Sequence, residues 1–192
     1  MLRTHRRFAV AVVALAFSLT GCSHPHAGAS APAPAPAPAR PPFNETDAAF
    51  AAQLVSQHQQ GLDLASLANS RSGRGELKAL AQRFIDVHEP EIEQLSELLE
   101  SWGQQPPEDP GLDRGNRPGK ITEAEMNTVT SRSGADFDKL FVQLMIRHHQ
   151  GAIDIVATET AGGKNPRARE LADKIAVSQQ NEVTELKNVG GV

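Results

Sequence analysis

Apolar residues recur at intervals of three and four along four segments of the chain, which is the spacing of the buried face of an α-helix. The segments cover residues 45–69, 76–101, 135–161 and 165 onwards, and each is predicted to form a long helix. The capping box Thr122-Glu123-Ala124-Glu125 predicts a short additional helix that ends near residue 132. Because no segment shows a convincing strand pattern, the sequence predicts an all-α fold.

The breaks between these segments pair the long helices into two hairpins. Residues 71–75 and the pair Gly162-Gly163 predict tight turns, whereas residues 103–120 hold four prolines and four glycines and form a longer connection. Pro90 lies inside the second helix and removes a backbone donor there, so we expect a kink or a break near His88. Two hairpins joined by one link predict a four-helix bundle over residues 44–190, since neither hairpin buries its apolar face alone.

The two hairpins carry the same pattern, shifted by 91 positions without a gap. Eight residues of the first half recur in the second, where chance alone would give about three. The repetition predicts that residues 44–102 and 135–190 form halves related by a pseudo-twofold axis. The identical pairs are Phe50 and Phe141, His58 and His149, Gln59 and Gln150, Asp63 and Asp154, Leu80 and Leu171, Ala81 and Ala172, Glu91 and Glu182, and Leu95 and Leu186.

Polar residues interrupt the middle of each apolar stripe. Antiparallel helices of similar length bring the middle of one beside the middle of the next, so we expect these side chains to meet at the centre of the bundle. In chain order they are His58, His88, Glu91, His148 or His149, Gln179 and Glu182.

Burying imidazoles and carboxylates is costly unless each group finds a partner. Imidazole nitrogen and carboxylate oxygen are common ligands of transition metals, so one interpretation is a metal site. The other interpretation is a hydrogen-bonded network in which Glu91 or Glu182 accepts a proton from an imidazole. The sequence leaves both interpretations open.

Catalytic chemistry has no positive support in the sequence. A ferritin-type di-iron centre uses a glutamate from each of two helices and a Glu-x-x-His pair from each of the other two. This chain offers His88-x-x-Glu91 and Gln179-x-x-Glu182, with histidine in place of the remaining glutamates, which leaves too few carboxylates for two irons. With no nucleophile–base arrangement, phosphate loop or cofactor fingerprint in the sequence, we expect a protein that is not an enzyme.

The N-terminal segment predicts export and lipid anchoring. Arginines precede a short apolar run at residues 8–17, which is too short to span a membrane. Leu19-Thr20-Gly21-Cys22 resembles a bacterial lipobox, in which the cysteine receives a thioether-linked diacylglycerol; an ordinary secretory signal is the alternative. We therefore expect a lipoprotein signal peptide over residues 1–22, a lipid anchor on Cys22, and attachment to the extracytoplasmic face of the cell membrane. Residues 23–43, rich in alanine and proline, predict a disordered tether.

Charge and cysteine content narrow the range of partners. Without residues 1–21 the chain has 16 basic and 23 acidic side chains, and its formal charge changes from −4 to −7. This acidity argues against a nucleic-acid partner and against a basic membrane-binding surface. Because Cys22 is the only cysteine, no intrachain disulfide is possible, and stability depends on the core or on a bound metal.

The second half contains the most recognisable run of residues. Residues 141–154, Phe-Val-Gln-Leu-Met-Ile-Arg-His-His-Gln-Gly-Ala-Ile-Asp, resemble the signature of the bacterial family named domain of unknown function 305, and residues 171–183 resemble its second block. The resemblance covers residues 44–189. It implies a ferritin-like four-helix bundle, usually exported, with some members associated with copper binding or tolerance through histidines and methionines. By the same resemblance, metal-binding roles fall to Met145, His148, His149, Gln179 and Glu182.

The chain departs from that family at its methionines. Leucine or isoleucine stands at five positions where the family usually has methionine, and only Met126 and Met145 remain in the domain. Thioether sulfur selects soft Cu(I), whereas the remaining nitrogen and oxygen donors suit Cu(II) or Zn(II) as well. The five positions are Leu54, Leu64, Leu95, Ile155 and Leu186.

Two functional hypotheses follow. The first is a membrane-anchored, surface-exposed lipoprotein whose bundle binds a transition metal, with copper handling or tolerance as its role and zinc as the alternative metal. The second is a non-catalytic envelope lipoprotein whose bundle binds an unknown protein partner, with the histidines and glutamates forming only a buried hydrogen-bond network.

Overall fold

The computed structural model describes residues 42–107 and 117–191. All regular structure in these two ranges is helical, which confirms the predicted all-α class. The predicted signal peptide, the lipidation site Cys22 and the predicted tether up to residue 41 lie outside the described residues. The helices are α1 (Glu45–Ser66), α2 (Ala68–Arg71), α3 (Gly75–Ser101), α4 (Glu123–Thr130), α5 (Gly134–Gly162) and α6 (Pro166–Gly190).

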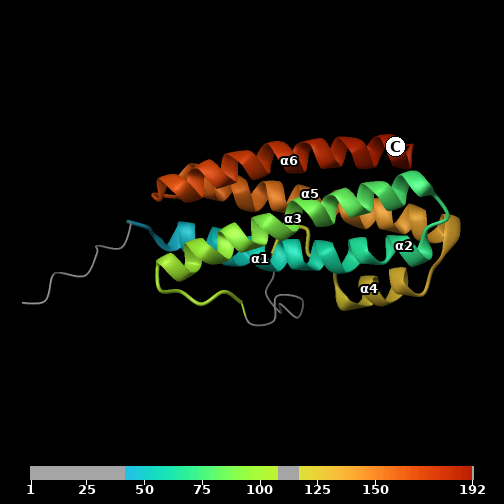
Figure 1. The fold of residues 1–192 in the computed structure, drawn as a ribbon, viewed down its shortest axis with the longest axis horizontal. Coiled ribbons are helices and arrows are strands. Elements are labelled where there is room, and N and C mark those ends of the chain that lie inside the picture. The colour runs from blue at the N-terminus through green and yellow to red at the C-terminus, as the bar shows by residue number, and fades with distance from the viewer. Residues whose placement is uncertain (1–41, 108–116, 192) are drawn as a thin grey trace, which may run out of the picture. The chain divides into compact units, whose positions relative to one another are not determined.

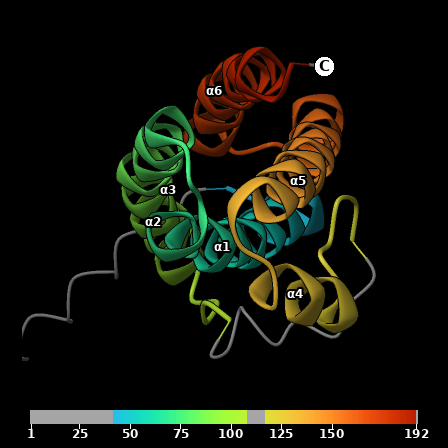
Figure 2. The same ribbon diagram turned by 90° about the vertical axis from the view of Figure 1, so that its right-hand side faces the viewer.

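The four long helices form two hairpins, α1 with α3 and α5 with α6 (Figure 1). Seen from the end of the helices, α1, α3, α6 and α5 surround a common interior, while the short α4 lies outside against α5 (Figure 2). The hairpins also pack on each other, through α1 against α5 and α3 against α6. Each long helix therefore has two long neighbours, and the ferritin-like classification stays a prediction.

Side-chain caps fix where the helices begin. The Asn44 side chain accepts a hydrogen bond from Asp47 N at 3.0 Å, and Asp47 Oδ2 accepts one from Asn44 N at 2.6 Å. The capping box predicted at Thr122 is confirmed, because its hydroxyl accepts from Glu125 N and its own N–H donates to the Glu125 carboxylate. These reciprocal bonds satisfy backbone donors that a helix start leaves without partners.

Two helix boundaries differ from the sequence prediction. The first predicted helix ends at Ser66 rather than residue 69, and the four-residue α2 follows after Leu67. Of the kink or break predicted near His88, the break is wrong, because α3 continues without interruption through Pro90; the kink stays a prediction. The backbone carbonyl that loses its donor belongs to Asp86, which is exposed, so water can replace the missing bond at low cost.

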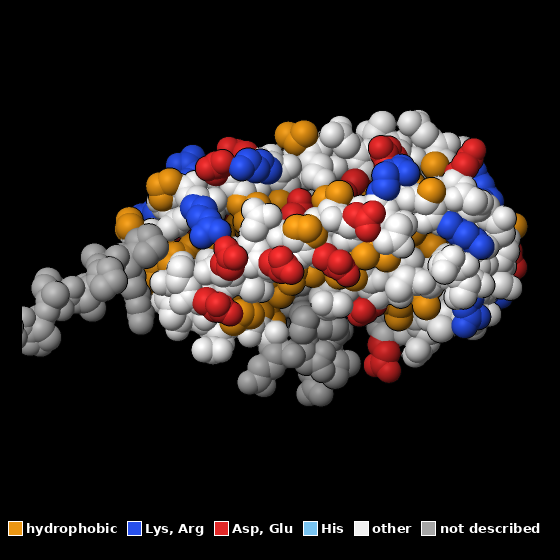
Figure 3. Space-filling view, in the orientation of Figure 1, with side chains coloured by type: hydrophobic (Ala, Val, Ile, Leu, Met, Phe, Trp, Pro, Cys, Tyr) orange, Lys and Arg blue, Asp and Glu red, His pale blue; other side chains and the backbone are white. Residues whose placement is uncertain are grey.

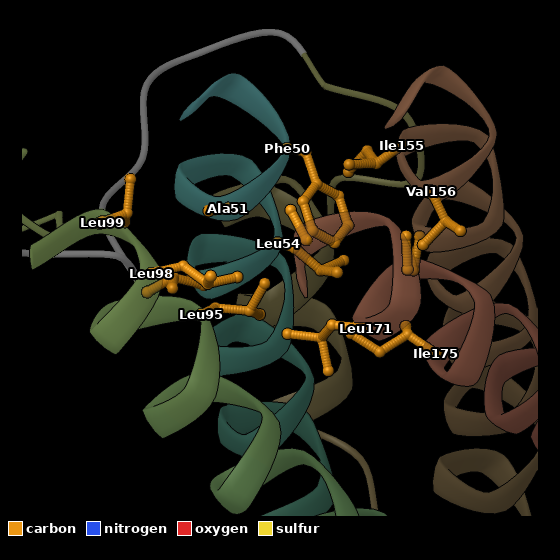
Figure 4. Packing of buried hydrophobic residues seen from close by; sticks show 14 of the residues in the cluster. Phe50, Ala51, Leu54, Leu95, Leu98, Leu99, Ile155, Val156, Leu171 and Ile175 are labelled. Atoms are coloured by element: carbon orange, nitrogen blue, oxygen red, sulfur yellow. The ribbon is translucent and has the colours of Figure 1, made fainter. Parts of the chain in front are cut away.

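The buried apolar residues form two clusters at opposite ends of the bundle. One cluster, shown in Figure 4, contains Phe50 and Leu95. The other contains Phe141 and Leu186, which are the partners of those two residues under the 91-residue shift. The shift thus exchanges the clusters, as expected for a pseudo-twofold axis that crosses the middle of the bundle. Phe43, the last residue of the predicted tether, packs on the first cluster and stacks on Trp102 with ring centroids 4.9 Å apart.

The surface that α3 and α6 share carries side chains of both charges together with scattered apolar groups (Figure 3). All four histidines of the described ranges are at most 2% exposed, and none is visible on this face. Within residues 42–107 and 117–191, no helix is both long enough and apolar enough to cross a membrane.

Candidate metal centre

A layer of polar side chains separates the two apolar clusters at the middle of the bundle. Each of its members is less than one tenth exposed, and all four long helices contribute. The structure therefore brings together most of the metal-binding residues predicted from sequence. The members are His58 from α1, His88 and Glu91 from α3, His149 from α5, and Gln179 and Glu182 from α6.

Each half supplies one short histidine–carboxylate contact to this layer. His58 Nε2 lies 2.7 Å from Glu91 Oε2. His149 Nε2 lies 2.8 Å from Glu182 Oε2, which is the same contact in the second half under the 91-residue shift. The repeat seen in the sequence therefore extends to the pairing of individual side chains.

His88 lies where the two halves meet. It contacts its own counterpart under the shift, because Gln179 Nε2 is 3.1 Å from His88 Nε2. Two residues separated by the repeat length touch only when they lie beside the pseudo-twofold axis. His88 Nε2 also lies 3.0 Å from Glu182 Oε2, and its ring stacks on His58 with centroids 4.4 Å apart. His88 thus contacts residues of both halves. Strict symmetry would place a second histidine at position 179, where this chain has glutamine.

Two overlapping groups in this layer have the geometry of a metal site. Within each group the potential ligand atoms lie no more than 4.8 Å from one another. Ligands placed about 2.0–2.1 Å from one tetrahedral ion are about 3.3 Å apart, so small shifts of these side chains would accommodate a metal. The groups are His58, His88 and Glu91, and His88, His149 and Glu182.

Several atoms of the layer have no hydrogen-bond partner within the described residues, although they are fully buried. The short contacts of His58 Nε2 and His149 Nε2 to carboxylate oxygens lack hydrogen-bond geometry, and His88 Nδ1 has no partner there either. A buried polar atom left without a partner costs about 1–3 kcal/mol. A cation held between the nitrogen and oxygen atoms would satisfy them together, so the residues present fit a bound metal.

The orientation of His149 supports the same conclusion. Its Nδ1 lies 2.8 Å from the carbonyl oxygen of Met145, one turn earlier on α5, and the carbonyl can only accept, so Nδ1–H donates. In the neutral ring this leaves a lone pair on Nε2, which faces Glu182 Oε2. Two acceptors in contact need a proton or a cation between them. Backbone carbonyls that hold the far nitrogen of a histidine in this way are typical of metal ligands.

Burial keeps His58 and His88 neutral. It lowers the pKa of His58 to about 3, and it lowers that of His88 to about 4, aided by the neighbouring His58. A neutral imidazole is the form that binds metals, so these side chains are ready for coordination at neutral pH.

The two carboxylates of the layer differ despite their pseudo-symmetry. Burial raises the pKa of Glu91 to about 7. Burial by itself would also raise the pKa of Glu182, but the contacts with His149 and His88 outweigh burial and lower this pKa to about 2. The asymmetry follows from His88, whose ring nitrogen approaches Glu182 and thereby gives that carboxylate a second imidazole. Of the two carboxyl groups, Glu182 is consequently the one that is fully ionised at neutral pH.

Met145 and His148 are not part of the layer, although the sequence placed both among the metal-binding residues. The Met145 side chain packs in the second apolar cluster, and only its backbone carbonyl contacts the layer. His148 belongs to neither group of potential ligands; its Nε2 lies 2.8 Å from Gln57 O and its Nδ1 lies 3.1 Å from Gly119 O. Of the adjacent histidines, His149 is therefore the one in the candidate site.

The residues that hold His148 were missed by the sequence prediction. Gln57, its counterpart under the 91-residue shift, donates through Nε2 to His148 O at 2.8 Å. Arg117, from the connection between the halves, donates to Gln57 Oε1 at 2.7 Å. The shift itself was the available signal, because it aligns Gln57 with His148 as it aligns His88 with Gln179.

Glycine lets this connection lie directly on α5. A Cβ atom added to Gly151 would be 2.3 Å from the Pro118 carbonyl carbon, so no larger residue fits there. Gly119 has a positive φ of 69°, which glycine adopts readily. In the run His148-His149-Gln150-Gly151, His148 contacts the connection, His149 belongs to the polar layer, and Gly151 leaves the space in which the connection lies.

The fold and this layer define a helical-bundle protein with a buried imidazole–carboxylate centre. Residues 47–190 match the family described as Domain of unknown function (DUF305). The chain therefore belongs to the DUF305 family. No curated protein matches it.

Solved structures with the same fold include members of this family and a copper-binding protein. A DUF305 fragment from Deinococcus radiodurans has 28% identity and a TM-score of 0.70, over 79% of this chain and 99% of that one. A DUF305 protein from Streptomyces coelicolor, provisionally described as secreted, has 22% identity and a TM-score of 0.67, over 75% and 91%. CopM in its Cu(II)-bound form has 25% identity and a TM-score of 0.66, over 76% and 95%.

Proposed function

We propose that this protein binds a transition-metal ion in the polar layer at the middle of its bundle. The observation that carries the proposal is the set of buried imidazole and carboxylate atoms that have no hydrogen-bond partner within the described residues. A network that existed only for packing would leave these atoms at a cost, whereas a metal would use them as ligands.

The donor atoms favour Cu(II) or Zn(II). The layer presents imidazole nitrogen, carboxylate oxygen and the Gln179 amide, and the Met145 thioether packs in the apolar cluster. Without sulfur ligands the site lacks the soft donors that select Cu(I). CopM, which has been solved with Cu(II), Cu(I) and silver bound, supports metal binding by this fold.

The proposed role is binding in the cell envelope rather than catalysis. The lipobox-like run that ends at Cys22 supports a lipid anchor, with the domain on the extracytoplasmic side. A protein of this kind would hold copper or zinc at the cell surface and so contribute to metal handling or tolerance. The acidic charge of the chain supports a cationic partner over a nucleic acid.

The decisive measurement is the metal affinity of the protein purified without a histidine tag. We expect a Kd for Cu(II) or Zn(II) below about 10 μM. Replacing Glu91→Gln and Glu182→Gln together keeps the shape of both side chains but removes their charge, and should weaken binding at least about tenfold. The matched control is Glu89→Gln with Glu170→Gln, two exposed glutamates on the same helices, which should bind like the unchanged protein.

Failure of the unchanged protein to bind either ion below about 10 μM would overturn the proposal. The layer would then be a hydrogen-bond network, in keeping with the contacts of His88 to Gln179 and Glu182, and protein binding would become the better hypothesis. Equal affinity in the Glu91→Gln, Glu182→Gln variant would place the metal elsewhere in the chain.

A further inference from the structure

The buried layer lies beside a cavity between α3 and α6. A cavity of about 200 Å³ lies at this seam, and one cluster carboxylate, Glu182, forms part of its wall. The space is sufficient for several water molecules and hence for a hydrated cation. The cavity is lined by Arg83, Phe84 and Val87 from α3 and by Ser178, Asn181, Glu182 and Glu185 from α6.

Glu182 reaches from the cavity to the centre of the layer. Its Oε2 contacts His149 and His88, while its Oε1 accepts a hydrogen bond from the Ser178 hydroxyl at 3.2 Å, on the cavity wall. A cation in the cavity would therefore meet Glu182 Oε1 first. The other oxygen of the same carboxylate, Oε2, already contacts the histidines of the candidate site.

Phe84 separates the cavity from the imidazoles. Its ring is 1% exposed and lies 4.9 Å from the His149 ring and 6.2 Å from the His88 ring, measured between centroids. The same side chain lines the cavity. Movement of this one ring would therefore change the space between the cavity and two of the candidate ligands.

An ion pair ties the two walls of the cavity together. Arg83 Nη2 on α3 lies 2.9 Å from Glu185 Oε2 on α6, and both side chains are about half exposed. α3 and α6 make fewer contacts with each other than the helices within either hairpin do. The Arg83–Glu185 ion pair is therefore one of the contacts that hold this less closely packed pair of helices together.

We propose that this cavity is the port through which a hydrated divalent transition-metal ion reaches the buried layer. Glu182 is the first cluster ligand that the ion meets, Phe84 is the barrier, and the Arg83–Glu185 ion pair holds the seam closed. This inference rests on the proposed function, because it presupposes that the layer binds a metal.

The inference predicts changes in the rate of metal exchange with little change in affinity. Phe84→Leu makes the barrier smaller but keeps it apolar, and Arg83→Gln breaks the ion pair and frees the Glu185 carboxylate. Phe84→Leu should speed both uptake of Cu(II) or Zn(II) and its transfer to a chromophoric chelator by about tenfold, which corresponds to about 1.4 kcal/mol of barrier. Arg83→Gln removes an exposed ion pair and should speed both by about two- to fivefold. The equilibrium affinity should change by less than about threefold, because neither side chain is a ligand.

The chain offers a matched control for each variant. Phe141→Leu makes the same change in the same apolar cluster, away from the cavity. Arg167→Gln breaks another ion pair between α6 and α3, in which Arg167 Nη2 lies 2.7 Å from Glu97 Oε2, again away from this cavity. Both controls should exchange metal at the rate of the unchanged protein, and urea unfolding would verify that all four variants are folded.

The outcomes separate this inference from the proposed function. An unchanged protein that binds no metal overturns both. An unchanged protein that binds metal, while Phe84→Leu and Arg83→Gln exchange it at the original rate, overturns the port alone. Equal acceleration in Arg167→Gln would also overturn it, because loosening the bundle anywhere would then be sufficient. Arg83 is exposed, so its variant remains informative even if Phe84→Leu fails to fold.

Discussion

At the scale of single residues, the two adjacent histidines of α5 have different environments. His149 faces the polar layer and the Glu182 carboxylate, whereas His148 faces the backbone of Gln57 and Gly119. Successive residues of a helix are about 100° apart, so two neighbours can both be buried only if the helix is covered on two sides. The bundle covers one side of α5, and the connection that contains Gly119 covers the other.

His88 lies in the polar layer and His148 does not, so replacing each of them by glutamine should give different results. Glutamine already stands at the counterpart of each residue, Gln179 for His88 and Gln57 for His148. His88→Gln should weaken metal binding at least about tenfold, because both groups lose their shared imidazole. His148→Gln should leave the affinity nearly unchanged and lower the free energy of unfolding by about 1–3 kcal/mol, because its two backbone contacts are lost.

Titration calorimetry and urea unfolding of both variants would check this prediction. Loss of metal binding in His148→Gln, with His88→Gln still binding, would return the site to the residues that the family resemblance implied.

At the scale of helices, a buried carboxylate joins the start of α1 to the turn between α5 and α6. Asp47 accepts hydrogen bonds from Asn44 N, and from Lys164 N and Asn165 N at 3.0 and 2.8 Å. Three backbone donors on one side chain connect segments that are more than a hundred residues apart. Glu159 is buried beside it, and burial together with the Asp47 carboxylate raises the pKa of Glu159 to about 7.

The raised pKa predicts a pH dependence of stability that one substitution removes. Between pH 4.5, the ordinary pKa of a glutamate, and about 7, the folded chain retains a proton on Glu159 that the unfolded chain has released. Its contribution to the free energy of unfolding therefore falls as pH rises through this window. Glu159→Gln is neutral at every pH, so the variant should be more stable than the unchanged protein at pH 8 and gain less or nothing at pH 5.

Urea unfolding at the two pH values measures this difference, with exposed Glu100→Gln on α3 as the control. A variant that is less stable at both pH values would show that the carboxyl group makes a contact that an amide cannot replace.

Sequence periodicity was sufficient to predict most of the helices, since their determinants are local. Within the helix predicted over residues 135–161, the apolar residues Phe137, Phe141 and Met145 recur at intervals of four and are buried, and the Thr122 capping box begins α4. The helix does not break at Pro90, because the carbonyl that loses its donor faces solvent, and the neighbouring helices decide which side of the helix faces solvent. The segment at residues 117–121 was predicted only as a connection, because its packing on α5 depends on contacts between distant residues.

At the scale of the whole molecule, the two duplicated halves pack around one polar layer, to which both contribute side chains. The pseudo-twofold axis exchanges the apolar clusters and passes beside His88 and Gln179. Because the axis residue differs between the halves, the two potential metal groups overlap at one histidine, and their carboxyl groups differ in pKa. A metal in the first group would join α1 to α3, and a metal in the second would join α3, α5 and α6, so binding and global stability should be coupled.

This coupling predicts a metal-dependent melting temperature. At a free metal concentration one hundred times Kd, a single site that exists only in the folded chain adds about 2.7 kcal/mol to the free energy of unfolding. For a domain of this size that corresponds to a rise of about 5–10 °C, which a chelator should reverse. Differential scanning calorimetry with and without Zn(II) would measure the shift, and His88→Gln should reduce it. An unchanged melting temperature in a protein that binds the ion would place the site outside the bundle centre.

The sequence by itself determined the helical class, the duplicated halves and the residue types of the candidate site. Periodicity, capping and internal repetition depend only on the order of residues along the chain, so they can be recognised without the tertiary structure. Only the tertiary structure decided which of two adjacent histidines enters the centre, that Met145 packs elsewhere, and that His88 is shared between both groups. It also revealed the cavity beside the centre, of which Glu182 forms part of the wall. These features depend on the angle at which each helix faces its neighbours, and contacts between distant residues fix that angle.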